Sequence, residues 1–122
     1  MNSPLPCLEV HHEGDRTVVR FADLDRLDES NSHAPRQELF RLADGLPRCR
    51  LVLDLGNILF VTSAGLGLLL TLNRRVRSAG GRLVLANLSP AVAEVIAVTN
   101  LGTVLEVCPS AANPWPLTSL SA

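Results

Sequence analysis

Lysine is absent from this chain of 122 residues, in which all eleven basic residues are arginines. Schiff-base chemistry and the nucleotide-binding P-loop both require a lysine amine, so the sequence excludes these two classes of enzyme. Twelve acidic residues bring the formal net charge to -1. A chain so balanced lacks the broad positive field on which nucleic-acid binders and proteins of acidic membrane surfaces depend. We therefore expect neither nucleic acid nor a membrane as a partner.

Cysteines are few, and the three that occur, Cys7, Cys49 and Cys108, are far apart. An odd, scattered set with no CxxC pair and no histidine at metal-ligand spacing argues against a disulfide framework and against a metal site. We interpret these residues as small apolar side chains with free thiols, as is usual in a reducing cytosol. We expect neither a metal nor a cofactor.

Long apolar runs are also missing. The longest, Ala64–Leu70, is far too short to cross a bilayer, and residues 1–6 have neither the basic nor the apolar region of a secretion signal. These features predict a cytoplasmic protein. The length and the 47% hydrophobic content suit one domain with one core. We place this domain at residues 1–108 and expect a flexible tail at 109–122, which shows no sustained period.

The chain has clear strand patterns. β-Branched and aromatic residues on either side of a turn at Glu13–Asp15 predict a β-hairpin over residues 7–22. Short continuous apolar runs are typical of strands that are covered on both faces. They predict strand regions at 51–55, continued by 58–61, at 82–86 and at 103–107.

Helical periodicity alternates with these strands. Apolar residues at helical spacing predict amphipathic helices at 30–46 and 63–79. Pro35 fits only near the start of the first helix, and Gly80–Gly81 ends the second. Ser89 can cap a third helix whose first residue is a proline. The order of elements predicts an α/β fold, a single domain with a mixed β-sheet and amphipathic helices, and right-handed crossovers place consecutive helices on one side of the sheet.

One loop stands out because it joins a buried strand to a helix, a place that α/β proteins commonly use for sites. Ser63 is at the helix start, and the loop reads Val61-Thr62-Ser63-Ala64-Gly65-Leu66-Gly67. Thr62 or Ser63 could simply cap the helix by accepting a backbone N–H bond. Alternatively, phosphorylation of Ser63 would add about 1.5 to 2 negative charges beside a helix N-terminus, which favours anions. Such a modification would change docking and leave the fold as it is.

Two enzymatic interpretations of this loop fit poorly. A serine hydrolase elbow needs a glycine where Val61 stands, and all three histidines precede the serine. A phosphate cradle needs either a longer glycine pattern or a P-loop lysine. The two glycines leave a choice open: Gly65 and Gly67 either let a partner's backbone approach closely or only permit tight packing of the helix on the sheet.

Four segments follow one another in a set order: Leu51-Val52-Leu53-Asp54-Leu55, Phe60-Val61-Thr62-Ser63-Ala64-Gly65-Leu66-Gly67, Gly80-Gly81-Arg82-Leu83-Val84-Leu85 and Ser89-Pro90-Ala91-Val92. This ordered series resembles the STAS domain of bacterial anti-sigma-factor antagonists. The resemblance runs from about Cys7 to Val107. Its specificity comes from the order of the segments, since any one of them alone would be a weak signal.

The resemblance implies a binding switch and not an enzyme. In the family the loop typically reads Asp-Ser-(Ser/Thr)-Gly-Leu-Gly, and its first serine is phosphorylated by an anti-sigma factor that is also an ATP-dependent serine kinase. That serine corresponds to Ser63. The resemblance implies that the unphosphorylated protein binds the kinase and releases the sigma factor, that the phosphorylated protein lets go, and that a phosphatase acting on Ser63 is a further partner.

This sequence departs from the family pattern at several places. Thr62 stands where the aspartate is usual, and Ala64 replaces the second hydroxyl residue. A Gly-Glu-Leu-Asp stretch of the family appears as residues 22–25, in which the glycine is replaced by Ala22. The match suggests a docking role for Asp25, although aspartates are equally common in solvated turns. The partner-binding residues implied by the resemblance are Asp25, Thr62, Ser63, Ala64, Gly65, Leu66 and Gly67.

An alternative function is a constitutive scaffold, that is, a STAS interaction subunit of a signalling or transport assembly in which Ser63 is only a helix cap. A third, an esterase-like or nucleotide-hydrolysing enzyme, lacks a base at any recognisable spacing from Ser63. The arginines at positions 74, 75 and 77 could contact an acidic partner or a phosphate. On an amphipathic helix, however, such a charge run is most often the solvated face, and we interpret it so.

Overall fold

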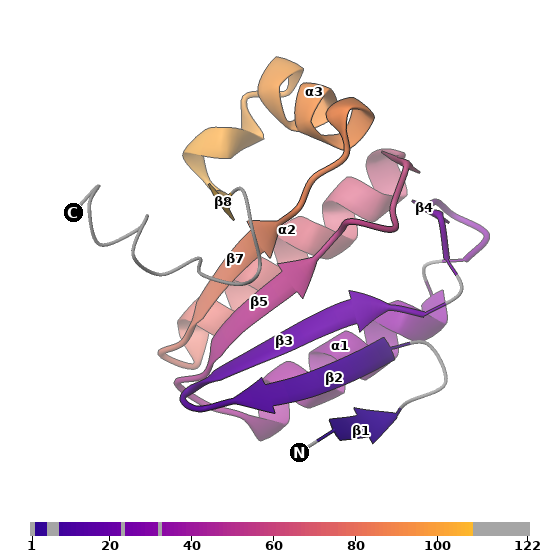
Figure 1. Ribbon diagram of the computed structural model, residues 1–122. Coiled ribbons are helices and arrows are strands. Elements are labelled where there is room, and N and C mark those ends of the chain that lie inside the picture. Colours follow the sequence, from indigo (N-terminus) through magenta and orange to yellow (C-terminus); the bar gives the residue numbers. More distant parts are fainter. Residues whose placement is uncertain (1, 5–7, 23, 32, 109–122) are drawn as a thin grey trace.

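A mixed β-sheet of six strands forms the centre of the molecule (Figure 1). The computed structural model describes residues 2–4, 8–22, 24–31 and 33–108. In spatial order the strands are β1 (Asn2–Pro4), β2 (Leu8–Glu13), β3 (Arg16–Phe21), β5 (Arg50–Asp54), β7 (Arg82–Ala86) and β8 (Glu106–Cys108). Strands β3, β5, β7 and β8 run parallel to one another, whereas β1 pairs antiparallel with β2 and β2 pairs antiparallel with β3. The expected mixed α/β fold is confirmed.

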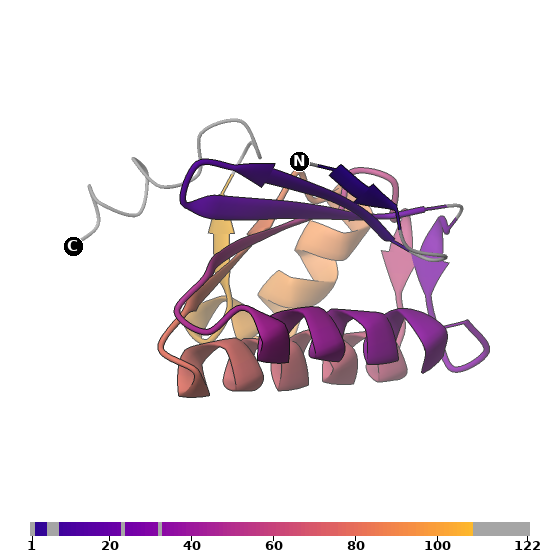
Figure 2. The ribbon, with the colours of Figure 1, turned by 90° about the horizontal axis from the view of Figure 1, so that it is seen from below.

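The described residues contain three helices: α1 (His33–Gly45), α2 (Ser63–Ser78) and α3 (Pro90–Val98). Helix α3 packs mainly against residues 60–61 and 101–103. Figure 2 shows α1 and α2 side by side on one face of the sheet, as right-handed crossovers require. Pro35 lies in the first turn of α1, where its missing N–H costs nothing. Gly80 ends α2 with a φ of 82°, a left-handed conformation that glycine adopts without strain. Ser89 caps α3, as predicted, because its side chain accepts a hydrogen bond from the amide of Val92.

The main core lies between the sheet and the helices. Leu51, Leu53 and Leu55 of the central strand region are fully buried there, together with Leu69 and Leu72 of α2. A second, smaller cluster lies on the other face of the sheet and consists of Val52, Val84, Ala86 and Cys108. Because both faces of β5 and β7 are buried, these strands have continuous apolar sequences and no alternation.

The cysteine interpretation holds for the two residues within the described part of the chain. Cys49 is half-buried and Cys108 is buried, and neither takes part in a disulfide. Burial raises the pKa of the Cys49 thiol, because the charged thiolate is disfavoured away from water. Cys7 and the tail at 109–122 lie outside the described residues.

The structure corrects the interpretation of the apolar run at 58–61. We expected this run to continue the strand region of 51–55 after Gly56–Asn57, but it does not pair within the six-stranded sheet. Its last two residues form β6 (Phe60–Val61), which pairs in parallel with β4 (Arg26–Leu27) in a separate two-stranded sheet (Figure 2). The last strand also starts later than expected, because residues 101–103 form a 3-10 turn, η1 (Leu101–Thr103).

Candidate functional site

Ser63 is the first residue of α2, directly after β6. The preceding residue, Thr62, has an extended backbone and occupies the N-cap position, from which its carbonyl accepts a hydrogen bond from the amide of Leu66 at 2.9 Å. The side chain of Ser63 is exposed. Its hydroxyl has no hydrogen-bond partner within the part of the chain that the structure describes. Ser63 therefore offers a free hydroxyl at the start of a helix.

The helix-cap interpretation of Thr62 and Ser63 is wrong. The hydroxyl of Thr62 makes no cap hydrogen bond and instead donates to the carbonyl of Leu27 at 3.3 Å. The amide of Thr62 donates to the same carbonyl at 3.0 Å. Both bonds extend the pairing of β6 with β4, and this pairing turns the Thr62 side chain away from the helix. Thr62 thus anchors the loop, while Ser63 has no structural task.

The two glycines of the loop have opposite surroundings. Gly65 is buried, and a Cβ atom there would collide with Val61 and would lie 2.7 Å from the carbonyl oxygen of Leu27. A Cβ atom at Gly67 would meet nothing within 4 Å, and this residue is exposed. Tight packing of α2 on the small sheet therefore explains Gly65. Gly67 leaves open surface on the outer face of the helix.

The other two residues of the predicted set support the helix. Ala64 is half-buried, and Leu66 packs against the main core. Of the seven residues that the resemblance implies, only Asp25, Ser63 and Gly67 are exposed.

A direct backbone contact brings Asp25 to this site. Its carbonyl oxygen accepts a hydrogen bond from the amide of Leu59 at 2.6 Å. Asp25, Arg26, Leu59 and Phe60 line a shallow hollow of about 220 Å³. The side chain of Arg26 is held by an ion pair with Asp28 at 3.1 Å. The Asp28 carboxylate accepts hydrogen bonds from the Ser30 hydroxyl and from the amides of Ser30 and Asn31. These bonds anchor the loop that carries Asp25, and they lower the pKa of the Asp28 carboxyl.

Leu59 and Phe60 are functional candidates that sequence reasoning missed. Leu59 is 60% exposed and Phe60 is 48% exposed, although both belong to a run that has the composition of a buried strand. The sequence carried no signal for this exposure, because an apolar run of four residues predicts a buried strand. We name the exposed set Asp25, Leu59, Phe60, Ser63 and Gly67 the switch surface.

Asp54 holds the start of the segment that leads to this surface. It ends β5 and is buried. Its carboxylate accepts hydrogen bonds from the guanidinium of Arg20 at 3.0 Å and from the amide of Gly56 at 2.9 Å. Burial acts to raise the pKa of Asp54, but the hydrogen bonds from Gly56, Arg20 and Asn87, with the charge of Arg20, outweigh burial and lower it. An aspartate inside an apolar run was the signal for this role.

The described residues show no grouping suited to a metal and no membrane-spanning helix. Within residues 8–22, 24–31 and 33–108, no three His, Cys, Asp or Glu side chains gather as a metal would require. None of the helices found there is long and apolar enough to cross a membrane.

Known proteins resemble this chain in both sequence and fold. Residues 8–113 match the model of the STAS domain family. A candidate anti-sigma factor antagonist, BtrV of Bordetella bronchiseptica, is 33% identical over 84 residues, which cover 69% of this chain and 72% of that protein.

Solved structures agree with this match. An anti-sigma-factor antagonist (STAS) domain protein from Planctomyces limnophilus superposes with a TM-score of 0.77 at 24% identity, over 86% of this chain and 91% of that one. The unphosphorylated form of the anti-sigma factor antagonist SpoIIAA superposes with a TM-score of 0.66 at 21% identity, over 83% and 87% of the two chains. At these identities the superpositions establish the fold.

Proposed function

Since this chain belongs to the STAS domain family, we propose that it is an anti-sigma factor antagonist whose binding to an anti-sigma factor with serine kinase activity is switched off by phosphorylation of Ser63. The observation that carries the proposal is the exposed Ser63 hydroxyl, which has no partner within the described residues and lies at the start of α2, shortly after the exposed Phe60 of β6. The protein acts in the cytoplasm as a substrate of the kinase, and a phosphatase restores the free hydroxyl.

The position of Ser63 suits a phosphate without disturbing the fold. The first turn of α2 contains no acidic residue, so a phosphate meets no like charge within that turn. The unpaired amides of a helix N-terminus favour an anion. Phosphorylation therefore leaves α2 intact and changes only what the surface presents.

The switch surface accounts for the effect on binding. Leu59 and Phe60 offer apolar contact area, and Gly67 lets a partner's backbone approach closely. A phosphate carries about 1.5 to 2 negative charges, which would have to lose water when a partner covers it. Without a matching cation on the partner, this desolvation opposes docking. Asp25 and Ser63 would contact the partner directly, while Thr62, Ala64, Gly65 and Leu66 hold the surface in place.

The test is a comparison of partner capture by the wild type, Ser63→Ala and Ser63→Asp in lysate of the source cells. Phosphate on the wild type is mapped by mass spectrometry, and the captured kinase is then purified for measurement of its Kd. We expect an ATP-binding serine kinase on the wild type and on Ser63→Ala, and binding weaker by at least about tenfold with Ser63→Asp, a loss of about 1.4 kcal/mol. Phosphate should be found on Ser63.

The matched control is Gln37→Asp, which adds the same charge at an exposed position of α1. It should bind the kinase as the wild type does. Phe60→Ser should weaken binding without any change of charge, because it removes apolar contact area. Equal capture of one partner by all Ser63 variants, with no phosphate on Ser63, would contradict the switch and indicate a constitutive binding module.

A further inference from the structure

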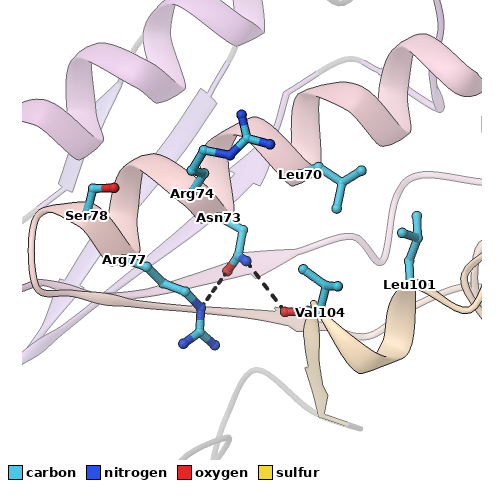
Figure 3. Close-up of a pocket in the computed structure, with 7 residues that line it drawn as sticks. All are labelled: Leu70, Asn73, Arg74, Arg77, Ser78, Leu101 and Val104. Atoms are coloured by element: carbon cyan, nitrogen blue, oxygen red, sulfur yellow. Dashed lines mark hydrogen bonds between the residues drawn. The ribbon is translucent and has the colours of Figure 1, made fainter.

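A groove lies along the C-terminal half of α2, between this helix and the turn that precedes β8 (Figure 3). Its volume is about 640 Å³. Sites for small molecules typically span about 300 to 1,000 Å³, so the groove has room for one. Its lining residues are Leu70, Asn73, Arg74, Arg77, Ser78, Leu101 and Val104. The switch surface is at the other end of the same helix.

A buried amide in this groove keeps a spare donor. Asn73 is only 4% exposed. Its oxygen accepts a hydrogen bond from Nε of Arg77 at 3.2 Å, and its nitrogen donates to the carbonyl of Val104 at 3.5 Å (Figure 3). The second bond is long, and a side-chain amide has two N–H donors. Among the described residues nothing accepts the other one, and a buried donor without an acceptor is costly.

The groove also carries unbalanced positive charge. Arg74 is exposed and has no ion pair or hydrogen bond within the described part of the chain. Arg77 pairs with Glu106 at 2.8 Å, but Arg82 pairs with the same carboxylate at 2.7 Å. In a protein of net charge -1, this end of α2 is therefore locally positive. A negative ligand group would meet the guanidinium of Arg74 without displacing an existing partner.

The other end of the groove is apolar. Leu70, Leu101 and Val104 gather there, away from Ser78 (Figure 3). Val104 is 49% exposed, so its side chain contributes accessible apolar surface to the groove. The groove thus offers the guanidinium of Arg74, the buried amide of Asn73 next to Val104, and the aliphatic side chains of Leu70, Leu101 and Val104 (Figure 3).

We propose that this groove binds a small amphipathic carboxylate, with its acid group on the guanidinium of Arg74 and its alkyl chain along Leu70, Leu101 and Val104, close to the buried amide of Asn73. A carboxylate matches the forked donors of arginine. Such a ligand would bridge α2 and the segment 101–104, to which the long Asn73–Val104 bond connects it. This site is separate from Ser63 and does not depend on the kinase.

The probe for the test is decanoate, titrated into uniformly 15N-labelled full-length protein and followed by two-dimensional NMR. We expect saturable shifts of the Asn73 side-chain amide and of the backbone amides of Leu101 and Val104. Arg74→Gln should weaken binding by at least about tenfold, the loss expected for one charge-assisted hydrogen bond. Arg41→Gln, at an exposed position of α1, is the matched control and should bind decanoate as the wild type does.

Two further ligands separate the contributions of charge and chain. Butyrate has the acid group without the long chain, and decyl maltoside has the chain without the charge; both should bind more weakly than decanoate. Val104→Ser should reduce the affinity of the protein for decanoate, while the NMR spectrum of the variant remains that of a folded protein. Equal affinity of the wild type and Arg74→Gln, equal binding of decyl maltoside, shifts scattered over the whole surface, or no saturable shifts would each overturn the proposal.

Discussion

Gly65 and Gly67 are two residues apart on α2, yet replacing each by alanine should have opposite effects. At Gly65 a Cβ atom would lie 2.7 Å from the carbonyl oxygen and 2.8 Å from the Cβ atom of Leu27, so Gly65→Ala forces α2 away from β4 and β6. Overpacking of this kind costs about 1–3 kcal/mol. At Gly67 the space is open, and alanine is favoured over glycine in a helix by up to about 1 kcal/mol.

Urea unfolding of the two variants checks this prediction. Gly65→Ala should lower the midpoint and Gly67→Ala should raise it slightly or leave it unchanged. Because the variants share one helix and one chemical change, any difference between them reports on surroundings alone. Equal stabilities would mean that α2 does not pack on Leu27 as described.

At the scale of the element, α2 and α3 each have a serine at the N-terminus: Ser63 is the first residue of α2, and Ser89 directly precedes α3. Only Ser89 caps its helix. Ser89 accepts a hydrogen bond from the amide of Val92 at 3.4 Å, whereas Ser63 caps nothing. Ser89→Ala should therefore cost about 1 kcal/mol of stability, and Ser63→Ala should change it by no more than about 0.5 kcal/mol. Thermal and urea unfolding measure both changes. A loss of about 1 kcal/mol with Ser63→Ala would restore the cap interpretation.

The pairing of β4 with β6 shows why element boundaries alone do not define the site. Residues 26–27 and 60–61 are far apart in sequence, and each forms a strand of only two residues. Their pairing places Asp25 beside Leu59 and turns the hydroxyl of Thr62 toward Leu27. The exposed positions of Leu59 and Phe60 follow from this pairing, because so small a sheet has no second layer to cover them.

At the scale of the whole molecule, Asp54 links three parts of the fold. Its carboxylate joins Arg20 of β3 to the turn at Gly56, and Asn87 after β7 also contacts it. The pKa of Asp54 is lower in the folded state than the ordinary value of 3.8. Its ionised form therefore stabilises the fold fully above that ordinary value, and this contribution is lost as the pH falls through the folded-state pKa.

We predict that the free energy of unfolding of the wild type falls as the pH is lowered below about 4, and that Asp54→Asn makes this fall shallower. At neutral pH the variant should be less stable by about 1–3 kcal/mol, since a buried hydrogen-bond network loses its charged acceptor. Urea unfolding at a series of pH values measures both effects. Asp44→Asn, which removes an exposed pair with Arg75, is the control and should change stability little. A pH profile unchanged by Asp54→Asn would show that this carboxylate is not responsible.

The sequence by itself determined the three helices, the hairpin of β2 and β3, and the central strands in their order, because their signals are local. It did not predict β1, β4 or η1. Apolar periodicity predicted α2 and the central strands, and the Ser89–Pro90 pair predicted the start of α3. The sequence also placed Ser63 at a helix start and identified the family, since each segment of the motif is a continuous stretch of residues.

Only the tertiary structure decided which residues of that motif face outward. The contact of β4 with β6 buries Gly65, exposes Leu59 and Phe60, and uses the Thr62 hydroxyl for the backbone of Leu27. These outcomes depend on pairing between segments more than thirty residues apart, and no local pattern specifies such pairing. An exposed leucine and a buried one have the same sequence signal, so the surface that surrounds Ser63 became visible only in the folded chain.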